Sequence, residues 1–212
     1  PAAGQTLAAL LNEQTDDPFL TAAVLSSALP HLGPLAESAN PVARTSLLPM
    51  VLASGNRSAL ADLLAPIFDL ESKENGTTSL QRWRWFGAFL DEVEARRSSL
   101  EELQKTAPND PLSRLLAQSS HLFTEATALL QDTNVPHFDR LAAAALLARH
   151  APSREASLAF FHKQLQDGLH GDWSAILAAS AATGDPALPD QLLGLWPQLS
   201  PLQRNSSLDT FL

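Results

Sequence analysis

The same helix opener occurs four times in this chain, and it constrains the fold more than any other feature of the sequence. It consists of a small polar residue, a proline, two further residues and then an arginine or threonine. The Asp, Asn or Ser side chain accepts hydrogen bonds from N–H groups of the first helical turn, and proline suits the first helical position because it has no N–H that would go unused. The openers predict helix starts at Asp17-Pro18, Asn40-Pro41, Asp110-Pro111 and Ser200-Pro201.

A basic residue recurs one turn inside these helices. Arg44, Arg114 and Arg204 each stand three residues after the proline of an opener. Arg140 follows a looser version of the opener, in residues 135–150. From this position a guanidinium group can reach back toward a neighbouring carboxylate or backbone carbonyl. The pattern therefore predicts that the helices are linked by arginine side chains as well as by apolar packing.

The segments between the openers also have helical periodicity, as in residues 58–70 and 155–168, and several of them end at glycine or proline. No segment alternates with the period of a strand. We expect an all-α chain, with residues 1–212 forming a single helical-repeat domain. Its predicted architecture is a HEAT/armadillo-like α-solenoid of about ten short antiparallel helices. A compact irregular bundle is the alternative, because the openers follow no strict period.

Composition excludes several kinds of site. The net charge is −9, with 14 basic and 23 acidic residues, whereas a protein that binds phosphate backbones normally presents a basic face. The chain has no cysteine, which excludes thiolate metal sites, iron–sulfur clusters and covalently attached haem within this segment. The longest apolar run, residues 141–148, is far shorter than the ~20 residues that a membrane-spanning helix needs. We therefore expect no nucleic-acid partner and no membrane span.

Catalytic motifs are also missing from the sequence. It contains no H-E-x-x-H, no G-x-S-x-G and no glycine-rich phosphate loop. Among the six scattered histidines, His162 and His170 are the closest pair, and they stand on an interrupted helix. Asp172 is interpreted as the cap of the helix that follows it. We expect no catalytic residue, no metal ligand and no cofactor-binding residue in this segment, and hence no enzyme.

One aromatic stretch, "RWRWFGAF" at residues 82–89, needs a separate account. On a helix, five of the apolar residues here and just beyond fall on one arc about 120° wide, which predicts a buried face. Arg82 projects within this arc, and Trp85 lies at its edge. Tryptophan beside arginine is typical of interface hot spots, and it is equally typical of a seam between packed helices. Arg82 and Trp85 are the candidate partner-contact residues. The predicted buried face consists of Trp83, Phe86, Phe89, Leu90 and Val93.

The openers with their internal arginine or threonine resemble HEAT-like repeats. More specifically, "DDPFLTAAVLSSALPHLGPLAE" and "LWPQLSPLQRNSSLDTFL" resemble the helical-repeat segment of large haem-binding proteins from planctomycetes and verrucomicrobia. The resemblance implies a dehydrogenase-like β-propeller before the repeats and a cytochrome c domain with C-x-x-C-H after them. No catalytic or haem-attaching residue of that family has a counterpart here.

This resemblance leads to a functional expectation. The chain is expected to be an excised segment of a larger protein and to act as a non-catalytic scaffold or protein-interaction module. Its expected partners are neighbouring domains of the parent chain or another protein, and its expected location is the periplasm or cell envelope. The alternative is a helical-repeat enzyme such as an AlkD-like DNA glycosylase, with Trp83, Trp85 and an aspartate in a cleft. The acidic charge disfavours that alternative.

Overall fold

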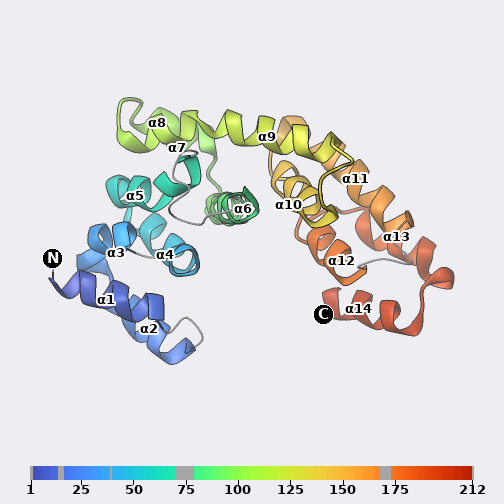
Figure 1. Ribbon diagram of the computed structural model, residues 1–212, viewed down its shortest axis with the longest axis horizontal. Coiled ribbons are helices and arrows are strands. Elements are labelled where there is room, and N and C mark those ends of the chain that lie inside the picture. Colours follow the sequence, from blue (N-terminus) through green and yellow to red (C-terminus); the bar gives the residue numbers. More distant parts are fainter. Residues whose placement is uncertain (1, 14–16, 39, 70–78, 168–172, 212) are drawn as a thin grey trace. The chain divides into compact units, whose positions relative to one another are not determined.

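The regular structure of this protein is helical throughout the part that can be described. The computed structural model describes residues 2–13, 17–38, 40–69, 79–167 and 173–211 (Figure 1). All elements in these ranges are helices, which confirms the all-α prediction. The polar stretch at residues 71–79 lies outside them except for its last residue, and so do His170 and Asp172.

The number of helices is higher than predicted. The described ranges contain fourteen α-helices and three short 3-10 helices, whereas the sequence pattern predicts about ten helices. The segment that begins at Asp17 divides near Pro30, because proline lacks the N–H that continues a helix and clashes with the preceding turn. The segment that begins at Asp110 divides at Gln118. The prediction of about ten helices was therefore too low.

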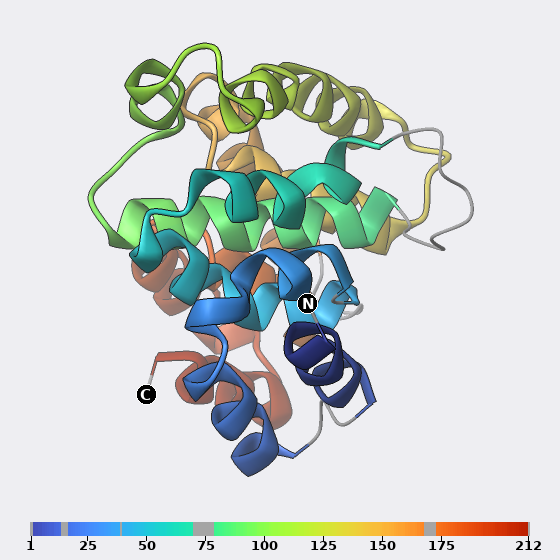
Figure 2. The same ribbon diagram turned by 90° about the vertical axis from the view of Figure 1, so that its left-hand side faces the viewer.

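Contacts along the chain define two compact units, Pro1–Leu122 and Phe123–Leu212. In the first unit, α3 packs against α1 and α5, and α5 packs against α8, while α4 packs against α6. The helices of the set α1, α3, α5 and α8 also contact those of the pair α4 and α6. Figure 2 shows α5 lying along α6. The elements of this unit are α1 (Ala2–Glu13), α2 (Pro18–Ser26), η1 (Leu29–His31), α3 (Leu32–Ser38), α4 (Pro41–Ser54), α5 (Arg57–Phe68), α6 (Ser79–Ala95), α7 (Leu100–Thr106) and α8 (Pro111–Ala117).

The second unit has a similar alternation. Helix α12 packs against α10 and α14, and α11 packs against α13 as well as against its neighbours α10 and α12. A helix thus contacts the helix two places along the chain. The elements are α9 (Ser119–Gln131), which begins in the first unit, α10 (His137–Leu147), η3 (Ala151–Ser153), α11 (Arg154–Asp167), α12 (Trp173–Ala181), α13 (Leu188–Leu195), η5 (Trp196–Gln198) and α14 (Pro201–Phe211).

All four predicted openers cap a helix. The Oδ1 atom of Asp17 accepts hydrogen bonds from two backbone N–H groups of α2, at 2.9 and 3.1 Å. The side chains of Asn40 and Asp110 accept one bond each, at 2.9 and 2.7 Å. Ser200 Oγ accepts a bond of 3.3 Å from the N–H of Gln203. These caps satisfy donors that the first turn of a helix leaves without a partner.

The predicted buried face of α6 is also confirmed. All five residues of the predicted arc are buried, and Trp83, Phe86 and Phe89 are among the largest fully buried side chains of the chain. The ring of Phe86 lies 5.6 Å from that of Phe68 on α5, in an edge-to-face arrangement. The aromatic stretch is therefore mainly the core of the first unit.

Arg44 links three helices of the first unit through backbone carbonyls. Its Nη1 donates to the carbonyls of Asp62 and Leu63 in α5, at 3.3 and 3.1 Å, and its Nη2 donates to the carbonyl of Glu37 at the end of α3. Pro66 lies inside α5 and has no N–H, so the carbonyl of Asp62, four residues earlier, lacks its usual helical donor. The guanidinium of Arg44 supplies a donor for it.

Two of the other arginines in the pattern bind helix ends in the same way. The Nε of Arg140 donates to the carbonyl of Leu130 in the last turn of α9, and the Nε of Arg204 donates to the carbonyl of Trp196. The sequence prediction that these side chains reach a neighbouring carbonyl is confirmed for Arg44, Arg140 and Arg204. Arg114 is exposed instead.

We expect Arg44→Ala to lower the free energy of unfolding of the first unit by about 2–4 kcal/mol, because buried carbonyls lose charged donors. Arg44→Lys should recover little of this, since an ammonium group cannot span carbonyls on two helices as the planar guanidinium does. Urea denaturation followed by tryptophan fluorescence measures the effect, with exposed Arg84→Ala as the control. Equal midpoints for Arg44→Ala and Arg84→Ala would contradict the linking role.

A second prediction concerns Asp110. Its carboxylate caps α8 and also forms an ion pair with the guanidinium of Arg57, from which it accepts hydrogen bonds. The hydrogen bond from Arg57 lowers the pKa of Asp110 below its ordinary value of 3.8. A carboxyl group whose pKa is lowered in the folded state stabilises that state at pH values above 3.8. The stabilisation is lost as the pH falls from 3.8 through the lowered pKa. Asp110→Asn keeps a good cap but removes the charge.

We therefore expect Asp110→Asn to lower the urea midpoint at neutral pH and to make that midpoint less dependent on pH below 4. Midpoints measured across this range for wild type and variant check the expectation. Glu101→Gln, at an exposed carboxylate of α7, serves as the control. Parallel pH curves for wild type and Asp110→Asn would show that the ion pair does not stabilise the fold.

Candidate binding groove

The two residues predicted to contact a partner lie on α6 and are buried. Arg82 is 8% exposed and Trp85 is 4% exposed. The guanidinium of Arg44, on α4, lies 5.3 Å from the centre of the Trp85 ring, so this tryptophan is part of the seam between α4 and α6. Contact of Arg82 and Trp85 with another protein stays a prediction; in this structure both side chains are buried, and Trp85 contacts Arg44 of α4.

A histidine–carboxylate pair is present that the sequence did not reveal. His162 Nε2 lies 2.6 Å from a carboxylate oxygen of Asp185. Burial raises the pKa of Asp185, but the hydrogen bonds from the N–H of Ala187 and from His162, together with the electrostatic effect of His162 and Arg154, lower it more in sum, so the net shift is downward. The Gln191 amide donates to the carbonyl of His162. These bonds hold the turn between α12 and α13 against α11.

The described residues contain no group of three or more His, Asp or Glu side chains that could hold a metal ion. Among the described residues, His162 and Asp185 form a pair that is not part of such a group. The sequence did not reveal this pair because the two residues are far apart along the chain: His162 precedes α12 and Asp185 follows it.

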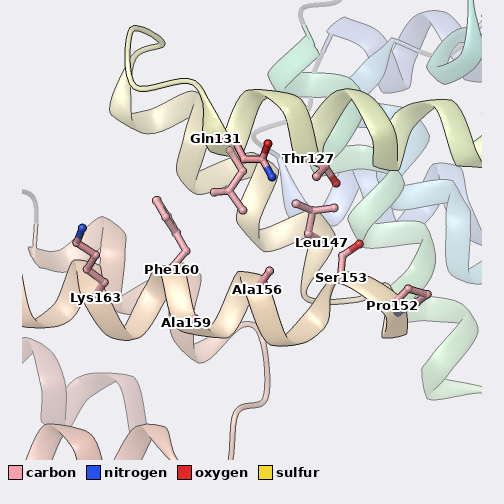
Figure 3. Close-up of a pocket in the computed structure, with 10 residues that line it drawn as sticks. Thr127, Gln131, Leu147, Pro152, Ser153, Ala156, Ala159, Phe160 and Lys163 are labelled. Carbon is pink, nitrogen blue, oxygen red and sulfur yellow. The ribbon is translucent and has the colours of Figure 1, made fainter.

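The second unit has an apolar groove between α9 and α11 (Figure 3). Its volume is about 500 Å³. Leu147, from α10, lies between the two helices that form its walls. We call it the α9–α11 groove. It is lined by Thr127, Leu130 and Gln131 of α9, Leu147 of α10, Pro152 and Ser153 of η3, and Ala156, Ala159, Phe160 and Lys163 of α11.

Positive charge is concentrated at one end of the groove. Lys163 is the only charged residue among the described residues that line the groove, and Figure 3 places it at the opposite end of the α11 wall from Pro152. The guanidinium of Arg140 lies 5.3 Å from the centre of the Phe160 ring and is held there by its bond to the carbonyl of Leu130. Phe160 and Leu130 both line the groove, so Arg140 adds a second cation near the same end.

The other end of the groove is held by His150. Its ring stacks on Phe123 of α9, with ring centres 4.0 Å apart, and its Nδ1 lies 3.0 Å from Ser153 Oγ. Burial lowers the pKa of His150. This histidine therefore joins α9 to η3, the two elements that bound this end of the groove.

The shape and lining of the α9–α11 groove are those of a binding surface. An apolar trough with a few polar groups at its margins is the usual form of a ligand- or peptide-binding surface. The groove was not predicted from the sequence. The only signal was the spacing of Ala156, Ala159, Phe160 and Lys163, which places all four on one face of α11.

Comparisons with known proteins give no relative to guide the functional assignment: no family model, no curated protein and no solved structure matches this chain. In the ranges that the structure describes, no single helix has the length and hydropathy to cross a membrane, although α2 taken together with Leu29–Glu37 passes that test as a pair bent by 73°.

We expect the second unit to lose stability as the pH falls through 6.5, the ordinary pKa of a histidine, because the folded state disfavours the protonated ring of His150. The stability should level off below the lowered pKa of the folded state. His150→Phe keeps an aromatic ring against Phe123 but does not titrate, so it should show a smaller fall. Urea midpoints between pH 5 and 8 test this, with exposed His121→Phe as the control. A fall of equal size in the His150→Phe variant would contradict the expectation.

Proposed function

We propose that this chain is a non-catalytic, HEAT-like scaffold whose second unit binds another protein. The observation that carries the proposal is the α9–α11 groove, an apolar surface with a cationic end that no described side chain fills. Several helices pack against the helix that comes two positions later in the chain. This packing supports a stack of helix pairs, as in an α-solenoid. Such stacks commonly present extended binding surfaces.

The alternative of a helical-repeat DNA glycosylase has less support. Trp83 and Trp85, the residues that could have lined its cleft, are 1% and 4% exposed. Their rings pack inside the first unit and present little surface to a flipped base, which such enzymes hold in an open pocket. The net charge of −9 also opposes binding to a phosphate backbone.

The resemblance to the helical-repeat segment of planctomycete and verrucomicrobial haem-binding proteins supports a more specific proposal. In it, the chain is a spacer between a dehydrogenase-like propeller and a cytochrome c domain, in the periplasm or cell envelope. The spacer would need no cofactor of its own, because the haem belongs to the neighbouring domain.

Sequencing the gene on both sides of the codons for Pro1 and Leu212 tests the spacer. We expect propeller-type repeats upstream and a C-x-x-C-H motif downstream. A reading frame that begins near the codon for Pro1 and ends near the codon for Leu212 would overturn the spacer proposal. The scaffold proposal would then depend on whether the chain binds another protein.

A heparin column tests the nucleic-acid alternative. We expect the purified chain to pass through at low salt, because its charge is strongly negative. Retention that is released by moderate salt, together with binding to a duplex oligonucleotide, would favour the glycosylase over the scaffold.

A further inference from the structure

We propose that the α9–α11 groove docks an amphipathic α-helix of a partner protein, with an apolar face in the trough and a carboxylate beside Lys163. The inference rests on the proposed interaction function and specifies the chemistry of the partner. Apolar contact would supply the affinity, and the cationic end would set the direction in which the helix lies.

The shape of the groove favours a helix. Its α11 wall has short side chains at Ala156 and Ala159, both exposed, so the backbone of a bound element can approach closely. The opposite wall presents Thr127 and Gln131, one turn apart on α9 (Figure 3). A trough between two helix faces is the surface into which the side-chain ridge of a third helix packs.

The length of the trough agrees with this occupant. Its α11 wall extends from Ala156 to Lys163, which corresponds to about 10 Å of helix at 1.5 Å per residue. A partner helix would therefore place roughly two turns in the groove, with anchors spaced by three and four residues. The groove is also open along the surface, whereas small-molecule sites enclose most of their ligand.

The charges beside the groove favour a negatively charged partner. Lys163 is exposed and forms no hydrogen bond or ion pair with any side chain in the part of the chain that the structure describes. Arg140 lies over Phe160 near the same end, and no carboxylate lines the groove. In a chain of net charge −9, this cationic end gives an acidic side chain a favourable position that most of the surface does not.

The experiment selects partners without assuming a sequence. A display library of helical peptides, with leucines spaced by three and four residues and all other positions random, is panned on the full chain. Binders that also bind the Ala159→Arg variant are removed, because that substitution fills the trough at an exposed position. We expect the remaining binders to be enriched in Asp or Glu at one end of the leucine face.

Lys163→Glu should weaken these binders by roughly tenfold, and replacing the peptide's acidic residue with lysine should restore the affinity. The matched control is Lys105→Glu, which makes the same charge change at an exposed lysine of α7 in the first unit. It should leave the affinity unchanged. Circular dichroism of each variant establishes that it is folded.

Three outcomes would overturn the proposal: no enrichment over the Ala159→Arg background, enriched peptides without a preference for acidic residues, or affinities that Lys163→Glu does not change. Dodecanoate is tested in parallel. Its binding to wild type but not to Ala159→Arg, with no peptide selected, would identify the groove as a site for a small amphiphile instead. The gene-flanking test does not depend on the groove, so failure of this inference and failure of the proposed spacer are distinguishable.

Discussion

The structure depends on how an array of short helices satisfies its backbone carbonyls. The last four carbonyls of every helix have no donor within that helix, and a proline inside a helix leaves one more without a partner. Arginine supplies donors at several of these points. Arg44 is the clearest case, because it binds α5 beside Pro66 and the end of α3 with one planar group. This places α3, α4 and α5 in a defined relation that apolar packing alone would specify less closely.

Most of the arginines discussed above form hydrogen bonds between helices, and Lys163 at the margin of the groove differs from them in this respect. Arg57 binds the carboxylate of Asp110 and the carbonyl of Leu103 in α7, and Arg154 binds the carbonyl of Thr183 beyond α12. These side chains serve the connections between helices. Lys163, by contrast, stands at the margin of an apolar trough and forms no such bond with any residue that the structure describes. The groove is therefore a better candidate for recognition than the buried Arg82 and Trp85.

The groove itself is a consequence of uneven packing in the second unit. Leu147 of α10 reaches the space between α9 and α11, but the short side chains of Ala156 and Ala159 on α11 leave part of that space unfilled. At the far end, stacking of His150 on Phe123 keeps α9 connected to η3. Rigid helices therefore bound the surface, and a partner would meet walls that are already in place, which lowers the entropic cost of binding.

The sequence by itself determined the helical class, the four capped helix starts and the buried face of α6, because caps and amphipathic spacing act over one or two turns. It also predicted that arginines of the openers reach carbonyls. It did not determine that Arg44 binds Glu37 and Leu63, that His162 meets Asp185, or that α9 and α11 enclose a groove. Only the tertiary structure decided these features, because each joins residues on different helices, and the position of one helix against another depends on side-chain packing that no local pattern records.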